Sequence, residues 1–361
     1  MNKSDLIINI TKPSQSSKLT RIKKFILQYE AEIFGSIILT VLVNYILGNL
    51  FARKCLLISY QKTPDTYDKG IDDIYFVAFW AIAFTFLRAF FIKYFYLPLS
   101  KYFNIGESCK RQRVAEQGYI LIYYLVFGTA GLYIMYHSPY WFNTAHLWIG
   151  YPHMINKEMK YYYLMQLAFW FQQIYGLHIE KRRKDHYAML SHHIVTIVLV
   201  GASYYCNATR VGNAILCCMD LSDIFLSLAK ILKYLGFTNV CNIAFGLFAL
   251  SWPITRHIFF SCVIWSIVVE PSKYLDLQWD PSNGKYLTLK NIRLFLILLL
   301  ILNVIMFYWF LMIVKLIIKV IKGTAANDPR SDDEDEEDSN CSDNGFQNPI
   351  KICSEKKHLY N

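Results

Sequence analysis

The sequence predicts an all-α, polytopic membrane protein with about eight transmembrane helices. The chain of 361 residues is 55% apolar and 17% aromatic, which exceeds what an ordinary soluble domain contains. Several of its apolar stretches reach the roughly 20 residues that a helix needs to cross a bilayer. Basic residues gather at alternate ends of these stretches, as the positive-inside rule expects of a multi-span protein.

The elements follow in order from a polar, basic segment over residues 1–32, which we expect to be cytosolic and to lack a cleavable signal. Basic clusters before the first span, between the second and third, between the fourth and fifth, and after the eighth fall on one side if both termini are cytosolic. The transmembrane helices are expected over residues 33–51, 74–97, 118–136, 161–179, 188–206, 211–234, 240–268 and 292–320.

The charge of the chain is unevenly distributed. The net charge is +10, although residues 331–339 read SDDEDEEDS, a run of like charges that we expect to be disordered. The basic residues are divided among membrane loops, which argues against nucleic-acid binding. The nine cysteines contain no CxxC pair and predict neither a disulfide framework nor a zinc site.

Ionisable side chains occur inside the fifth and sixth predicted spans. His193 lies 14 residues before Asn207, where we expect the turn between these spans, and Asp220 and Asp223 lie about 14 residues after it. Helices rise about 1.5 Å per residue, so both sets are expected roughly 20 Å from the turn, at one depth. Such groups are unfavourable in lipid, and their usual explanation is function.

His192, His193, Asp220 and Asp223 suit acyl transfer to an amine or alcohol. Histidine acts as base, acid or nucleophile near neutral pH, and a carboxylate can orient its ring. Two alternatives are a purely structural His–Asp pair and a divalent metal site. Adjacent histidines on a helix point about 100° apart, which suits chelation poorly, so we expect no metal or other cofactor.

Polar residues flank this set. Arg183 and Lys184, in KRRKDHY (181–187), can order lipid headgroups or hold the phosphates of a donor such as coenzyme A. Arg256 lies inside the seventh span and needs a partner, for which Asp220 or Asp223 is available. Trp170, in the fourth predicted span, either lines a cavity shared with these polar residues or simply packs against neighbouring helices.

The stretch RRKDHYAMLSHHIVTIVLVGASYYCNATRVGNAILCCMDLSDIFLSLAK (182–230) resembles the signature region of ceramide synthases, the sphingoid-base N-acyltransferases of the TLC family. Residues 58–91 and 131–141 resemble the fungal, yeast-type branch, as does the acidic tail. The short 98–117 linker has no room for the homeobox-like insert of many animal members.

This resemblance implies a six-helix TLC bundle over residues 112–323 that encloses a lipid cavity. Two transmembrane helices and a linker (33–111) would precede it, and an acidic cytosolic tail (324–361) would follow. The implied catalytic set is His192, His193, Asp220 and Asp223. The residues expected to bind substrate are Arg183, Lys184, Asp185, Trp170, Asn207, Arg210, Lys230 and Arg256.

The implied enzyme joins the acyl group of a fatty acyl-CoA, which is its cosubstrate, to a sphingoid base in the endoplasmic reticulum membrane. The resemblance also implies very-long-chain donors, dihydrosphingosine or phytosphingosine as acceptor, a small single-span regulatory subunit, and homo- or heterodimers of catalytic subunits. Ser331 matches a casein kinase 2 site. The alternatives from other classes are a non-catalytic TLC-type protein that binds or transports lipid and a proton-coupled transporter.

Overall fold

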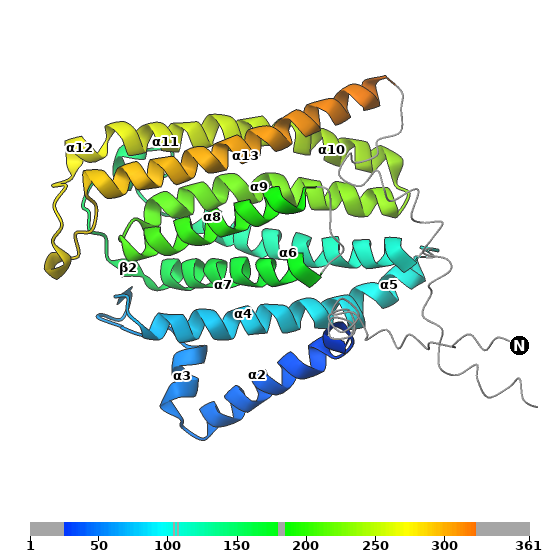
Figure 1. The fold of residues 1–361 in the computed structure, drawn as a ribbon, viewed down its shortest axis with the longest axis horizontal. Helices are drawn as coiled ribbons and strands as arrows, with labels where there is room; N and C mark the ends of the chain where they lie inside the picture. Colours follow the sequence, from blue (N-terminus) through cyan, green and yellow to red (C-terminus); the bar gives the residue numbers. More distant parts are fainter. Residues whose placement is uncertain (1–24, 104, 107, 180–184, 323–361) are drawn as a thin grey trace, which may run out of the picture.

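The computed structural model describes residues 25–322 apart from 104, 107 and 180–184, and within them it is a bundle of long helices lying side by side (Figure 1). The elements are α2 (Glu30–Ile46), α3 (Leu50–Leu56), β1 (Thr66–Tyr67), α4 (Asp72–Phe90), the π-helical η1 (Phe91–Tyr96), α5 (Leu97–Tyr102), α6 (Ser108–Tyr136), the short η2 (Thr144–Leu147), β2 (Ile155–Asn156), α7 (Lys157–Ile179), α8 (His186–Tyr205), α9 (Thr209–Tyr234), α10 (Thr238–Pro253), the π-helical η3 (Ile254–Phe259), α11 (Phe260–Val269), α12 (Pro271–Tyr274), η4 (Pro281–Asn283) and α13 (Leu289–Ile321).

The helical membrane fold is confirmed, because helices occupy the predicted spans in the part of the chain that the structure describes, although the first span, 33–51, is divided between α2 and α3. α2 has only 17 residues, and α7 and α9 bury many polar side chains inside the bundle, so these three are less clearly apolar spans. Helices long and apolar enough to cross a membrane run over Asp72–Tyr102, Lys110–Tyr136, His186–Tyr205, Thr238–Val269 and Leu289–Lys319.

Three local features differ from the expectation. α6 begins at Ser108, well before the predicted span at 118, because a helix can continue through polar residues beyond the bilayer. The seventh span is interrupted after Pro253 by η3, because proline cannot donate the regular helical hydrogen bond. A two-stranded antiparallel sheet pairs β1 with β2, although the sequence predicted helices alone.

The connection between α8 and α9 forms a tight turn at Asn207, as the sequence predicts. Asn207 has a φ of 56°, a left-handed conformation that asparagine tolerates better than most residues. Its side-chain amide donates to the carbonyl of Gly284 (2.9 Å) and its Oδ1 accepts from Lys69 Nζ (3.0 Å). We call this end of the bundle the turn end, and the loops around residues 69 and 284 meet there.

Lowering the pH should reduce the stability of the turn end, because it favours protonation of His153. This buried ring bonds through Nε2 to the carbonyl of Ile149 (3.0 Å), and its Nδ1 has no partner in the described part of the chain. Burial lowers the pKa of His153 to about 4, against roughly 6.5 in an unfolded chain. The unfolded state therefore binds a proton first, and the stability of the neutral ring is lost as the pH falls from 6.5 towards 4.

We expect the melting temperature of the detergent-solubilised protein to fall as the pH falls from 6.5 towards 4. The fall should be smaller in His153→Phe, whose side chain does not titrate. Equal slopes for the two proteins would contradict a role for His153.

Candidate active site

His192 and His193 lie on α8 between two tryptophans from other helices. The centroid of the Trp170 ring, on α7, is 5.5 Å from that of each histidine, and the Trp309 ring, on α13, is 5.4 Å from that of His192. His193 is only 4% exposed. The Nδ1 atoms of both rings are buried without a hydrogen-bond partner among the described residues. These imidazoles are therefore not committed to a structural hydrogen bond through Nδ1.

Asp220 and Asp223, one turn apart on α9, have different partners. Asp220 is 1% exposed and accepts a hydrogen bond from Gln166 Nε2 (3.1 Å). Asp223 Oδ2 lies 2.7 Å from Arg256 Nη2, which is the ion pair that the sequence allowed. Arg256 thus neutralises Asp223, whereas Asp220 has one hydrogen bond from Gln166 and its Oδ1 is buried without a hydrogen-bond partner among the described residues.

The π-helical segment η3 places Arg256. The Arg256 guanidinium also donates to the carbonyl of Met219 (2.6 Å) and lies over the Trp252 ring, 4.0 Å from the ring centroid. Short π-helical segments inside α-helices are frequent at functional sites, because they shift the side chains that follow. Here the segment follows Pro253, so the interruption of the regular helix sets the direction in which the buried Arg256 side chain points.

The structure differs from the expected His–Asp contact. In the described residues, no hydrogen bond joins His192 or His193 to Asp220 or Asp223. Gln166 and Trp170 are four residues apart on α7, so they share a helix face. Trp170 touches the histidines and Gln166 holds Asp220, so α7 connects the two halves of the set.

Gln166 is a residue that motif reasoning missed. Its amide donates to Tyr162 Oη (3.3 Å) as well as to Asp220, and its Oε1 accepts from Tyr123 Oη (2.5 Å). The sequence contains one signal for it, an amide one helical turn before Trp170 inside a predicted span. A buried amide in a span needs partners, but which residues supply them depends on helix packing.

Replacing Gln166 by leucine should lower the free energy of unfolding by about 2 kcal/mol or more, because it leaves Asp220 and Tyr123 buried without these partners. Gln172 offers a matched control on the same helix. It is 2% exposed, and neither polar atom of its side chain has a hydrogen-bond partner among the described residues. Gln172→Leu should therefore be neutral or stabilising. Thermal unfolding in detergent would measure both, and equal losses would contradict the network.

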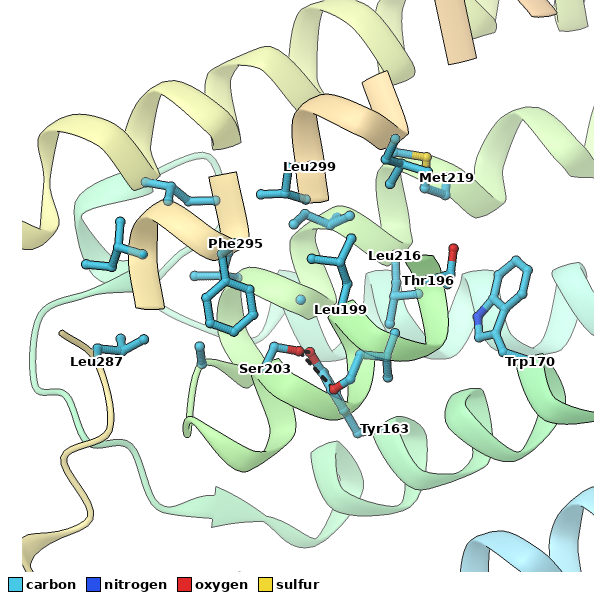
Figure 2. Close-up of a pocket in the computed structure, with 18 of the residues that line it drawn as sticks. Tyr163, Trp170, Thr196, Leu199, Ser203, Leu216, Met219, Leu287, Phe295 and Leu299 are labelled. Carbon is cyan, nitrogen blue, oxygen red and sulfur yellow. Dashed lines mark hydrogen bonds between the residues drawn. The ribbon is translucent and has the colours of Figure 1, made fainter. Parts of the chain in front are cut away.

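A cavity begins beside His192 and extends towards the turn end, and the space inside it together with its opening to the outside is about 780 Å³. Trp170 and His192 line it at one end and Leu287 at the other, and Figure 2 shows Trp170 and Leu287 on opposite sides of it. Most of its other lining side chains are aliphatic. Tyr163 and Ser203 hydrogen-bond each other in the wall (2.6 Å). The cavity thus suits a long apolar chain whose reactive end lies beside His192.

Gly212, also in this wall, approaches Tyr163 very closely. A Cβ atom at this position would overlap the Tyr163 hydroxyl, and the Ser203 hydroxyl would lie 3.2 Å away. Glycine therefore permits the close packing of α9 on α7 that shapes the cavity wall.

The remaining predicted binding residues are dispersed. Asn207 and Arg210 lie at the turn end, where Arg210 donates to the carbonyl of His146 (2.9 Å), and they hold loops there rather than joining the histidines. Asp185 is buried at the start of α8, and Lys230 lies on α9 two turns beyond Asp223. Arg183, Lys184 and Ser331 lie outside the described residues.

The described residues contain no group of three or more His, Cys, Asp or Glu side chains placed to hold an ion. The two aspartates are already engaged by Gln166 and Arg256. The arrangement therefore offers uncommitted imidazoles, a balanced acidic pair and an apolar cavity.

The chain is similar to known proteins over most of its length. The TLC domain matches residues 113–315. The chain is 40% identical over 333 residues to sphingosine N-acyltransferase lag1 of Schizosaccharomyces pombe, covering 91% of this chain and 85% of that protein. It is 37% identical over 285 residues to ceramide synthase LAG1 of Saccharomyces cerevisiae (78% and 69%) and 32% identical over 298 residues to ceramide synthase LOH1 of Arabidopsis thaliana (77% and 94%).

Proposed function

This chain belongs to the TLC-domain family and, within it, to the ceramide synthases, and from this premise we propose how its residues carry out acyl transfer. The enzyme transfers a fatty acyl group from acyl-CoA to the amine of a sphingoid base and releases CoA. The observation that carries the proposal is the apolar cavity that begins at His192. It would hold an acyl chain with its thioester beside His192.

His192 lines the cavity, whereas His193 is buried beside Trp170. We therefore assign His192 as the acyl acceptor and His193 as the base. In this route the neutral His192 imidazole attacks the thioester carbonyl, the C–S bond breaks, and the CoA thiolate leaves and takes up the proton that the acylated ring loses. The sphingoid amine then attacks the acyl-imidazole and gives a proton to the base, the bond between the acyl carbon and His192 breaks, and the proton passes from the base to the departing His192 ring as the amide forms.

A direct attack of the amine on the thioester, with histidine only as base, forms the same products. The two routes separate in a reaction without sphingoid base. The acyl-imidazole route releases up to one CoA per enzyme in a burst, whereas the direct route releases none.

Asp220, Asp223 and Arg256 act by orienting groups and balancing charge. Arg256 contacts the Asp223 carboxylate directly, so that these two opposite charges compensate each other inside the bundle.

The donor enters from the end of the bundle opposite the turn end, where α8 begins after Arg183 and Lys184. Basic side chains there would bind the CoA phosphates while the acyl chain extends towards the turn end. Lys230 and Asp185 lie towards the same end. Asn207 and Arg210, by contrast, would affect substrate only through the loops they hold.

Several finer properties rest on the sequence resemblance. They are an endoplasmic reticulum location with both termini cytosolic, very-long-chain donors, dihydrosphingosine or phytosphingosine as acceptor, a small single-span regulatory subunit, dimers of catalytic subunits, and phosphorylation at Ser331. The basic clusters that alternate along the chain support the orientation.

The test is ceramide formation in microsomes from cells whose own ceramide synthases are deleted. The chain is expressed with and without a candidate small subunit and supplied with a sphingoid base and a ladder of acyl-CoAs. Ceramide detected by mass spectrometry would support the proposal. Folded protein that binds lipid but forms no ceramide in any of these reactions would favour a non-catalytic lipid-binding or transport protein instead.

A further inference from the structure

The far wall of the cavity contains a tryptophan held in an unusually fixed orientation. Trp148 lies after η2, in the loop that precedes β2, is 3% exposed and lines the cavity. Its Nε1 donates to Ser266 Oγ (2.7 Å), and Ser266 is one turn before the end of α11. Trp148 therefore lies at the turn end of the cavity, away from the histidines.

A chain of buried hydrogen bonds continues from the indole. Ser266 Oγ donates to Glu270 Oε2 (2.6 Å), and Glu270 Oε1 accepts from Thr144 Oγ1 (2.7 Å). Ser266 is fully buried and Glu270 is 6% exposed. Burying a carboxylate is unfavourable unless it is hydrogen-bonded, and both oxygens of Glu270 are used here. These hydrogen bonds fix the indole plane through residues of α11, of the junction between α11 and α12, and of η2.

We propose that Trp148 limits the length of the acyl chain that the enzyme accepts, with Ser266 and Glu270 as positioning residues. This rests on the proposed function, because it takes the cavity to be the acyl site. An acyl chain anchored by its thioester at His192 extends towards the turn end, and its terminal methyl would meet the indole.

The physical reason is that a rigid aromatic wall discriminates by exclusion. A flexible side chain could move aside for an additional methylene, but an indole held by its N–H cannot move without losing its hydrogen bond. One methylene in an apolar pocket changes the specificity of an enzyme by roughly tenfold or more. Removing the indole should therefore shift the preference of the enzyme towards longer acyl chains. Removing only the hydrogen bond that holds the indole should make the enzyme discriminate less sharply between chain lengths.

The experiment measures kcat/KM along a ladder of saturated acyl-CoAs for the full chain in microsomes, with its small subunit if activity needs one. The variants are Trp148→Ala, Trp148→Phe and Ser266→Ala, with Ser266→Thr as the conservative rescue. Trp141→Ala is the matched control, because Trp141 lies in the same loop, is 36% exposed and does not line the cavity.

We expect Trp148→Ala to raise the ratio of kcat/KM for longer over shorter acyl-CoAs by roughly tenfold. Trp148→Phe and Ser266→Ala should shift it in the same direction by less, while Ser266→Thr and Trp141→Ala keep the original ratio. If Trp148→Ala fails to fold, Trp148→Phe and Ser266→Ala decide the matter. Active variants with unchanged ratios would overturn the proposal but leave the function intact. Absence of ceramide from the unaltered chain would instead refute the function.

Discussion

Replacing His192 by alanine is expected to abolish ceramide formation, with a fall in kcat of roughly 10³-fold or more. His192 lines the cavity and has no substitute at that position, because His193 points in another direction on the helix. A positioned acid or base alone contributes about 10²–10⁴-fold, and loss of a nucleophile removes the covalent route entirely. The measurement is the rate of ceramide formation at saturating acyl-CoA, in microsomes with matched amounts of enzyme.

His193→Ala should reduce the overall rate by a similar factor but differ in a single turnover. Without sphingoid base, His193→Ala should still release CoA in a burst, whereas His192→Ala should not. His137 supplies the control, since it is exposed at the end of α6, and His137→Ala should behave as the unaltered enzyme. A His192→Ala protein that retained the burst would rule out His192 as acyl acceptor.

Replacing Lys160 by methionine is expected to lower the free energy of unfolding by about 3–5 kcal/mol, because it strands a buried carboxylate. Lys160 is fully buried at the start of α7, and its Nζ lies 2.8 Å from Asp73 Oδ1 on α4. It also donates to the carbonyls of Ser59 (2.8 Å) and Asp68 (2.6 Å). The second Asp73 oxygen accepts from Tyr204 Oη on α8 (2.8 Å).

This cluster joins the N-terminal helices to the TLC domain, because α4 lies outside residues 113–315 whereas α7 and α8 lie within them. The loss should appear as a lower melting temperature in detergent. The double variant Lys160→Met/Asp73→Leu is the control, since removing both charges should recover much of the loss. A double variant no more stable than Lys160→Met would show that the carbonyl contacts, and not the ion pair, carry the stability.

Much of this fold can be predicted from the sequence because a bilayer imposes simple rules. A span needs about 20 apolar residues and must satisfy its own backbone, so composition alone predicts the helices. The depth of the histidines and aspartates follows from the rise per residue between His193, Asn207 and Asp220. The π-helical break after Pro253 and the strand pairing of Thr66 with Asn156 do not follow, because they depend on neighbours distant in the chain.

The sequence by itself determined the helices, and it predicted that the polar residues lie at one depth and that His192 and Asp220 belong to one site. Only the tertiary structure decided which partners those groups have. In the folded protein Gln166 donates a hydrogen bond to Asp220, and Arg256 forms an ion pair with Asp223. The fold also places Trp148 at the far end of the cavity. The physical reason is that hydropathy and rise per residue act along one helix, whereas hydrogen-bond partners and cavity walls arise from the rotation and packing of several helices.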